Sequence, residues 1–196
     1  MDTGKGEQGG AVNRETARIY DELLVAAAVT GDRAALTRLV VRWHPRLLRH
    51  AWRVLGDAER AKDMVQEAWV EILRGLSRLN DVAAFPAWAY RIVTRRCQRE
   101  FHRKSREPFE RDGEELLDVA ETPETASGET AAELASVAAA ISKLPAPQRA
   151  ALALFYIEDL SIAEIAIATD VPPGTVKTRL MHARRKVREL LLGDSS

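Results

Sequence analysis

The sequence predicts an all-α protein made of two small helical domains joined by a flexible acidic linker. Apolar residues recur at helical spacing on both sides of one polar segment, and no stretch shows the alternation of a β-strand. The polar segment is rich in proline, glycine, threonine and glutamate, and its apolar residues are too sparse to offset the entropy of ordering. A chain of 196 residues with 46% hydrophobic and 30% charged residues suffices for two small cores. The expected parts are a disordered tail at 1–14, an N-terminal domain at 15–106, the linker at 107–131, a C-terminal domain at 132–192 and a tail at 193–196.

In the N-terminal domain, capping residues divide the helical pattern into four helices. The first begins near Glu15, Gly31 ends it, and Asp32 caps the second. Pro45 is expected to break or kink the second helix, because its ring clashes with the preceding turn. Asp57 caps the third helix, and the fourth starts near residue 85. Together they predict a bundle whose third and fourth helices bury Val65, Ala68, Trp69, Ile72, Leu73, Leu76, Trp88, Ala89, Ile92, Val93 and Phe101.

The C-terminal domain contains the pattern of a helix-turn-helix. Ser161 and Glu164 are spaced to form a capping box, which fixes the start of a short helix. Pro173 suits the first position of the following helix, because it lacks an amide that would be unpaired there. A short capped helix, a tight turn and a basic second helix form the arrangement that places a recognition helix in the major groove of DNA.

The outer face of this second helix is cationic. An isolated basic helix is usually only a solvated surface, but the capped helix and turn before it favour DNA binding. Thr175, Thr178 and Arg179 stand in the first turns, where side chains reach bases, and the remaining cations are placed for phosphates. The predicted DNA-binding residues are Thr175, Lys177, Thr178, Arg179, His182, Arg184, Arg185 and Arg188.

Charge is strongly segregated along the chain although the formal net charge is zero. Residues 91–106 contain seven basic residues and one acidic residue, a net charge of plus six. Residues 107–133 contain ten acidic residues and one arginine, a net charge of minus nine. The positions of the charged residues therefore matter more for binding a polyanion than the net charge of the chain. The acidic segment is most simply interpreted as a solvated tether.

Several classes of protein and site find no support in the sequence. The single cysteine, Cys97, excludes an intramolecular disulfide, and the four histidines show no zinc-ligand spacing. We therefore expect no metal and no cofactor. Apolar runs are too short to span a membrane, and the first ten residues lack the apolar segment of a secretion signal. The sequence predicts a cytoplasmic protein without membrane insertion.

Short motifs recur in a fixed order in both domains. The C-terminal domain contains Leu144-Pro145, Gln148-Arg149, Leu160-Ser161, Glu164-Ile165-Ala166, Gly174-Thr175-Val176-Lys177, Arg179-Leu180 and Ala183-Arg184. The N-terminal domain contains Asp57-Ala58-Glu59, Asp63-Met64-Val65-Gln66-Glu67 and Trp88-Ala89-Tyr90-Arg91-Ile92. In these motifs the chain resembles one known family, the bacterial RNA polymerase sigma factors of the extracytoplasmic-function group. The resemblance covers most of the chain, and agreement in two domains makes an accidental match implausible.

The resemblance implies that the protein is not an enzyme. It would bind core RNA polymerase, recognise the minus-35 and minus-10 elements of promoter DNA and promote strand opening. It also implies an anti-sigma protein as a partner, and it assigns Asp63, Gln66 and Glu67 to polymerase binding and the basic second helix of the helix-turn-helix to the minus-35 element. Asp63, Gln66 and Glu67 lie within about one helical turn of each other, beside the expected buried face.

The resemblance further implies that the helix from residue 85 binds the separated minus-10 strand. A cationic track combined with a stacking aromatic ring is typical of single-strand binding. The family usually has asparagine where Arg95 stands and often aspartate where Arg99 stands. Arginine strengthens phosphate contact but lacks the paired donor and acceptor of an amide, so we expect an unusual minus-10 preference. The predicted residues are Tyr90, Arg91, Arg95, Gln98, Arg99 and His102, with Trp88 expected in the core.

Two points stay open at the level of sequence. Family analogy suggests that the acidic linker follows the basic walls of the polymerase cleft toward the RNA exit path, as an alternative to a solvated tether. A stand-alone helix-turn-helix repressor or activator is the second functional hypothesis, and an all-helical interaction protein or enzyme is the third. Run-off transcription with purified core polymerase separates the three, because only a sigma factor stimulates it.

Overall fold

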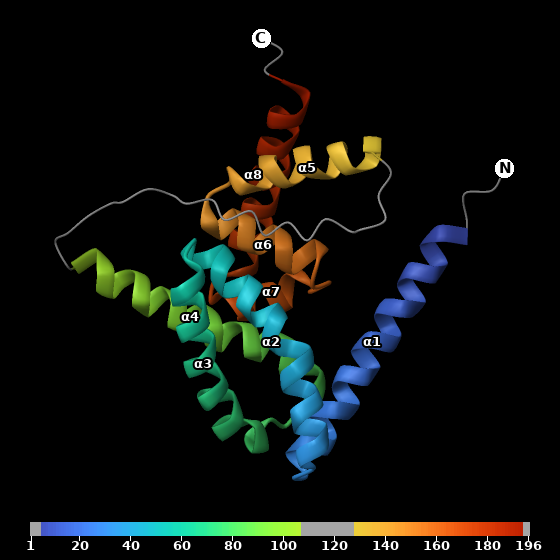
Figure 1. Ribbon diagram of the computed structural model, residues 1–196, viewed down its shortest axis with the longest axis vertical. Coiled ribbons are helices and arrows are strands. Elements are labelled where there is room, and N and C mark those ends of the chain that lie inside the picture. Colours follow the sequence, from blue (N-terminus) through green and yellow to red (C-terminus); the bar gives the residue numbers. More distant parts are fainter. Residues whose placement is uncertain (1–4, 107–127, 194–196) are drawn as a thin grey trace.

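A computed structural model describes residues 5–106 and 128–193 of the chain, and every regular element in these two ranges is helical. The elements form two modules, an N-terminal module from α1 to α4 and a C-terminal module from α5 to α8 (Figure 1). Their bounds are α1 Lys5–Val29, α2 Arg33–Leu55, α3 Ala58–Gly75, η1 Leu76–Arg78, η2 Val82–Ala84, α4 Phe85–Arg106, α5 Gly128–Ser142, α6 Ala146–Tyr156, α7 Ile162–Thr169 and α8 Pro173–Leu192. The all-α prediction is confirmed.

The N-terminal module is a four-helix bundle with an aromatic centre. Trp43 of α2 and Phe85 of α4 are fully buried, and their rings meet edge to face with centroids 5.1 Å apart. Val65 and Ile72 of α3 close the core at the helical spacing that the sequence showed. Trp88 is partly buried against the same core, as expected.

Helix ends in this module follow the capping residues. The Asp32 carboxylate accepts hydrogen bonds from the amides of Ala34 and Ala35 at 2.8 and 3.1 Å. Asp57 caps α3 in the same way. Of the break or kink expected at Pro45, the break is wrong, because α2 continues through Pro45 from Arg33 to Leu55, and a kink stays a prediction. Packing of the apolar face of α2 against α1, α3 and α4 outweighs the lost hydrogen bond.

Two helix starts lie earlier than the sequence pattern indicated. The α1 helix begins at Lys5, so the backbone of residues 5–14 is helical where a disordered tail was expected. The α5 helix begins at Gly128, inside the segment assigned to the linker. Extending an existing helix gains one hydrogen bond per residue without a new nucleus, so weakly apolar flanks can be included. The rest of the expected acidic linker, 107–127, lies outside the described residues.

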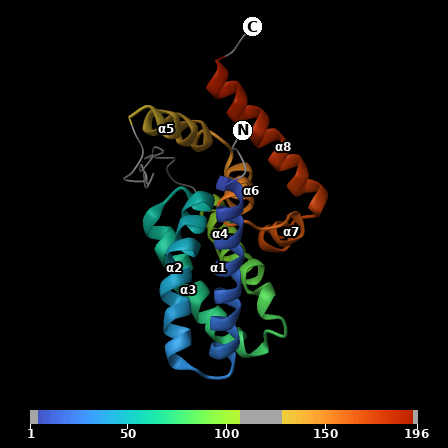
Figure 2. The same ribbon diagram turned by 90° about the vertical axis from the view of Figure 1, so that its right-hand side faces the viewer.

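The C-terminal module places the helix-turn-helix, α7 and α8, beside α5 and α6. Ile165 of α7 and Val176 and Leu180 of α8 are buried together with Leu154 of α6. This shared core fixes the angle between α7 and α8. Figure 2 shows α8 extending from the end of α7 to the C-terminal end of the chain, with α5 beside it.

The two modules pack directly against each other. The α7 helix lies along α4, and α6 lies against α2 (Figure 1). Buried residues of both modules, among them Ala151, Leu154 and Ile165, belong to one continuous apolar cluster with the bundle core. The sequence predicted two modules but contained no sign of this contact.

Candidate nucleic-acid interface

The helix-turn-helix is fixed by a complete capping box. The Ser161 hydroxyl accepts a hydrogen bond from the Glu164 amide at 3.2 Å, and the Glu164 carboxylate accepts one from the Ser161 amide at 2.7 Å. Burial opposes the charge on Glu164, but the hydrogen bonds from Ser161 and the nearby Arg18 outweigh it, and the pKa of Glu164 is lowered. Pro173 occupies the first position of α8, as predicted.

The α8 helix has one apolar face and one cationic face. Val176, Leu180 and Ala183 are buried. Of the predicted DNA-binding residues on α8, Lys177, Thr178, Arg184, Arg185 and Arg188 are exposed, whereas Thr175, Arg179 and His182 are half-buried. The structure thus brings all eight onto one short helix, with the exposed members available to a duplex.

Two details modify the cationic face of α8. Arg184 lies over the rings of Phe155 and Tyr156, with 5.5 Å from its guanidinium carbon to each ring centre. Glu189 lies next to the face and pairs with Arg185 at 3.6 Å. Both contacts restrain arginine side chains in the middle of the helix. Neither contact involves Lys177 or Thr178 at its N-terminal end.

A groove of about 550 Å³ separates α3 from α4 and brings acidic and basic side chains together. Asp63, Gln66 and Glu67 line it from α3, and all three are exposed. Arg96 of α4 donates to Glu67 at 2.5 Å and to Glu71 at 2.8 Å. The hydrogen bond to Glu71 has the largest effect on the pKa of Arg96 and raises it, and the hydrogen bond to Glu67 raises it further, although partial burial acts in the opposite direction. Glu67 is therefore held by its own module, whereas Asp63 and Gln66 face the groove.

The cationic track predicted on α4 is present in part, as a stripe of exposed side chains. Arg91, Arg95, Gln98 and Arg99 are exposed on one side of the helix. The side chain of His102 lies outside the described residues. Arg99 also lines the groove between α3 and α4, so the stripe and the predicted polymerase-binding residues adjoin each other.

Tyr90 differs from its expected position as a stacking platform on that stripe. Its side chain is fully buried, and its ring meets those of Trp43 and His50 with centroids 5.8 and 5.0 Å away. Burial and the Glu158 carboxylate raise the pKa of Tyr90 well above its usual value. Its spacing from the buried Val93 explains the difference, because residues three apart share one face of a helix.

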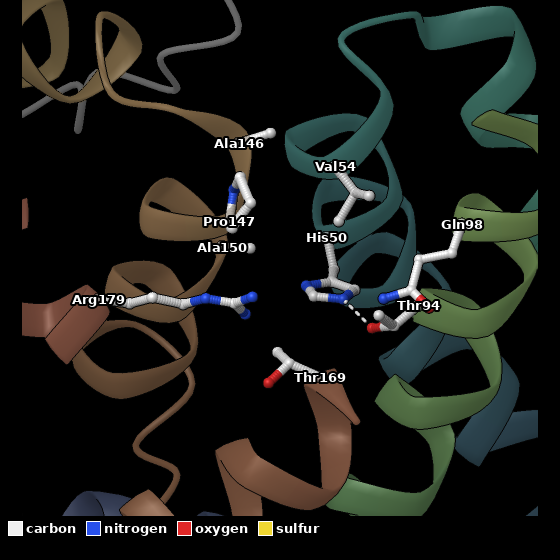
Figure 3. A pocket seen from close by; sticks show the side chains of 9 residues that line it. All are labelled: His50, Val54, Thr94, Gln98, Ala146, Pro147, Ala150, Thr169 and Arg179. Atoms are coloured by element: carbon white, nitrogen blue, oxygen red, sulfur yellow. Dashed lines mark hydrogen bonds between the residues drawn. The ribbon is translucent and has the colours of Figure 1, made fainter. Parts of the chain in front are cut away.

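A cavity of about 210 Å³ lies between the two modules (Figure 3). His50 and Gln98 line it from the N-terminal module, and Arg179 points into it from α8. His50 makes a hydrogen bond of 2.8 Å with the Thr94 hydroxyl. Burial, assisted by Arg53, lowers the pKa of His50 to about 3, so this imidazole is neutral near pH 7.

Comparison with known proteins assigns both modules. Residues 39–107 match the family described as Sigma-70 region 2, and residues 134–187 match Sigma-70, region 4. The chain is 32% identical over 181 residues to the RNA polymerase sigma-H factor of Pseudomonas aeruginosa, covering 87% of this chain and 93% of that protein. It is 36% identical over 171 residues to the ECF RNA polymerase sigma factor SigM of Mycobacterium tuberculosis, covering 87% and 84%. The chain belongs to the extracytoplasmic-function sigma factors.

Solved structures agree with the fold of this sigma factor. CnrH, solved in complex with the cytosolic domain of CnrY, aligns with a TM-score of 0.59 and 26% identity over 90% of this chain and 99% of its own. The sigma factor RpoE of Bartonella quintana, solved with the anti-sigma factor NepR, aligns with a TM-score of 0.64 and 19% identity over 81% of this chain and 98% of its own. The predicted architecture of two helical domains is confirmed.

Family membership also confirms that this sigma factor is a transcription initiation factor and not an enzyme. The region 2 match includes the α3 and α4 groove, and the region 4 match includes most of the helix-turn-helix. Within the described residues, no helix is long and apolar enough to cross a bilayer, and no three potential ligands cluster as a metal site would require. The roles of individual binding residues stay predictions.

Sequence reasoning missed the residues that join the modules. Glu158 and Asp170 of the C-terminal module pair with Arg46 and Arg91 of the N-terminal module. Asp170 has a positive φ of 55° and caps α7, and such a position is detectable from the Asp and the turn that follows. Its pairing with a residue 79 positions away has no local signal in the sequence.

Proposed function

We propose that this sigma factor contacts core RNA polymerase through α3, holds the separated minus-10 strand along α4 and docks α8 in the major groove at the minus-35 element. One observation carries the proposal: exposed Asp63 and Gln66 on α3 and exposed Lys177 and Thr178 on α8 belong to the same chain. A stand-alone DNA-binding protein would leave the residues of α3 without a role.

At the minus-35 element, the N-terminal end of α8 is the part that reaches the bases. The N-terminal residues of a recognition helix contact base edges in helix-turn-helix proteins. The Thr178 hydroxyl donates to the Gly174 carbonyl at 3.0 Å, and its oxygen remains able to accept from a base amine. Arg184, Arg185 and Arg188 lie further along the helix and supply salt-dependent phosphate contacts.

At the minus-10 element, exposed Arg95 and Arg99 form the centre of the strand-binding track on α4. Because Arg99 also lines the groove shared with Asp63 and Gln66, the strand would pass directly beside the polymerase contact. This arrangement couples strand capture to polymerase binding, and electrostatic contact with phosphates is its main source of affinity.

We further propose a cytoplasmic location and an anti-sigma partner. Transcription initiation places the protein with the chromosome and polymerase. Its structural relative CnrH was solved in complex with the cytosolic domain of CnrY, and RpoE with the anti-sigma factor NepR. A protein that binds the surfaces of α3, α4 and α8 would block polymerase and DNA at the same time.

Run-off transcription with purified core polymerase tests the proposal. Wild-type protein should direct specific starts on chromosomal promoter fragments, whereas a repressor would bind DNA without stimulating synthesis. The double substitution D63A/Q66A should weaken core binding, because it removes two exposed side chains from the groove. Glu67 is left intact because it holds Arg96. The control E133A removes an exposed carboxylate from α5, and equal core affinity of the two variants would overturn the assignment.

A further inference from the structure

We infer that the cavity beside His50 and Arg179 is a binding site for a small organic acid. Arg179 of α8 binds the carboxylate of this ligand, and apolar side chains of α2 and α6 enclose its single ring or a branched chain of similar size. A guanidinium without a partner, a buried imidazole nitrogen, the apolar wall and the volume of the cavity all support this site. None of the roles proposed above includes a small molecule.

Arg179 reaches the cavity as a cation without a counter-charge. Its side chain is half-buried and points into the cavity from α8 (Figure 3). Within the described residues it forms no hydrogen bond and no ion pair. Burial lowers the pKa of Arg179, and no carboxylate acts in the opposite direction. A partly desolvated guanidinium is stabilised by a hydrogen-bonded anion, so this side chain can bind one.

Other arginines at the contact between the modules already have such an anion. Three of them each donate to a carboxylate of the C-terminal module at 2.9 Å or less: Arg46 to Glu158, Arg91 to Asp170 and Arg18 to Glu164. By contrast, none of the nine residues that line the cavity is acidic. The carboxylate of a ligand can therefore pair with Arg179 as the protein's own carboxylates pair with the other three arginines.

The opposite wall of the cavity presents a second polar group. The Nε2 atom of His50 lies 2.8 Å from the Thr94 hydroxyl, whereas its Nδ1 atom is buried without a hydrogen-bond partner among the described residues. The imidazole faces the Arg179 guanidinium across the cavity (Figure 3). When the Thr94 hydroxyl donates to Nε2, the neutral ring carries its proton on Nδ1 and can donate to a carboxylate oxygen. One carboxylate can thus accept from both walls.

Most of the remaining wall is apolar. Its apolar members come from α2 and α6 and are Val54, Ala146, Pro147 and Ala150. The Thr169 hydroxyl already donates to the Ile165 carbonyl at 2.7 Å. Apolar walls with a few convergent polar groups are the usual composition of a small-molecule site. An inorganic anion such as phosphate would leave this apolar wall without a partner.

The volume of the cavity limits the ligand to about one ring. The cavity measures about 210 Å³. A cavity of about 150 Å³ is sufficient for benzene, whereas drug-sized molecules occupy pockets of about 300 Å³ or more. Gln98 and Pro147 line the cavity and are also exposed, so the cavity reaches the surface beside them. A monocyclic or branched short-chain carboxylate fits these limits.

A ligand in this cavity would make promoter binding sensitive to its concentration. This consequence rests on the proposed function, in which Arg179 contacts a base of the minus-35 element. A guanidinium that binds a carboxylate cannot pair with a base at the same time. Ligand and duplex therefore compete, and the affinity for the duplex should fall about ten-fold at a ligand concentration ten times its Kd.

Benzoate is the probe that tests the site. Its titration into the isotopically labelled full chain should produce saturable shifts in the amide NMR signals of lining residues such as Thr94 and Ala150. A Kd of about 0.1–1 mM is expected for a ligand of about nine non-hydrogen atoms. Benzamide keeps the size but lacks the charge, and acetate keeps the charge but lacks the ring. Each should bind at least about ten-fold more weakly than benzoate.

Two substitutions place the probe in the cavity. R179Q removes the positive charge, and A150L fills part of the cavity with a residue that favours helix. Each should weaken benzoate binding at least about ten-fold. R38Q makes the same change as R179Q at an exposed position of α2, and A26L makes the same change as A150L at an exposed position of α1. Both controls should bind benzoate as wild type does.

Three results would reject the site: no saturable shifts with benzoate up to about 10 mM, equal affinities for benzoate and benzamide, or equal benzoate affinities of R179Q and R38Q. None of them depends on whether the chain supports transcription. Competition is measured by fluorescence anisotropy with a minus-35 duplex from a promoter mapped with core polymerase, and an unchanged duplex affinity at saturating benzoate would exclude it. Failure of run-off synthesis would instead reject the proposed function and leave the benzoate comparison valid.

Discussion

The Glu158 carboxylate accepts a hydrogen bond from Arg46 Nε at 2.7 Å across 112 positions of sequence. The same guanidinium donates to Asp21 of α1 at 3.3 Å and lies over the Trp43 ring at 4.1 Å. Burial works against the charge on Arg46, but Tyr90, Glu158 and Asp21 outweigh it and raise its pKa. One side chain therefore links α1 and α2 to the C-terminal module.

Loss of the Glu158 carboxylate should destabilise the protein. E158A leaves Arg46 paired only with Asp21, and removing one partner of a buried pair costs about 3–5 kcal/mol in general. Because Arg46 keeps a carboxylate and is 24% exposed, we expect about 2 kcal/mol, measured by urea unfolding of the full chain. E158Q should cost less, since its amide oxygen can still accept from Arg46. A loss as small as that of E133A would contradict the role of the pair.

Gly75 at the end of α3 should not tolerate a side chain. A Cβ atom there would lie 2.8 Å from Cζ2 of Trp88, closer than real contacts allow. We expect G75A to reduce the free energy of unfolding by about 1–3 kcal/mol through overpacking. Gly174 in α8 is the matched control, because a Cβ there meets nothing within 4 Å. G174A should be neutral or stabilising by up to about 1 kcal/mol, and equal losses for both variants would show that packing is not the cause.

Local features of the fold could be predicted from the sequence because their causes are local. The capping box at Ser161 and the caps at Asp32 and Asp57 depend on residues within one helical turn, and all three are observed. The buried faces of α3 and α8 likewise follow from helical spacing, except that Leu73, expected in the core, is 45% exposed. The presence and order of the two modules were predicted from the family motifs, because each motif belongs to one module.

Features that depend on distant residues could not be predicted in the same way. The continuity of α2 through Pro45 depends on tertiary packing, which overrides the local preference. The prediction that Tyr90 stacks on a DNA base is wrong, because it considers only the aromatic ring. The spacing of Tyr90 from the buried Val93 indicates a position in the core. The pairing of Glu158 with Arg46 requires the two modules to be docked, and no local pattern encodes that.

His50 should make the protein less stable in mild acid. Its pKa is lowered from 6.5 to about 3 in the folded state, so below pH 6.5 the unfolded chain binds a proton that the folded chain does not. Stability is therefore lost as the pH falls from 6.5 toward 3, by about 2 kcal/mol at pH 5. Urea unfolding at pH 7 and pH 5 measures this difference.

The pH effect can be assigned to His50 by substitution. H50Q removes the titrating ring and keeps an amide that can pair with Thr94, so its stability should change much less between pH 7 and pH 5. H44Q removes an exposed histidine of the same helix and should keep the wild-type dependence. If H50Q and H44Q respond equally to pH, another group is responsible.

Arg179 and Arg188 should contribute differently to binding at the minus-35 element. Arg179 is half-buried near the start of α8, and burial lowers its pKa, whereas Arg188 is exposed two turns or more further along. R179A should reduce the preference for the cognate duplex over mutated duplexes by about 1–3 kcal/mol. R188A should weaken binding to all duplexes and reduce the slope of log affinity against log salt concentration by about 1.

Fluorescence anisotropy at several salt concentrations, with cognate and mutated duplexes, separates these two effects. R38A removes an exposed arginine of α2 in the other module and should change neither specificity nor the salt slope. Parallel losses for R179A and R188A on every duplex would mean that both arginines contact only phosphates.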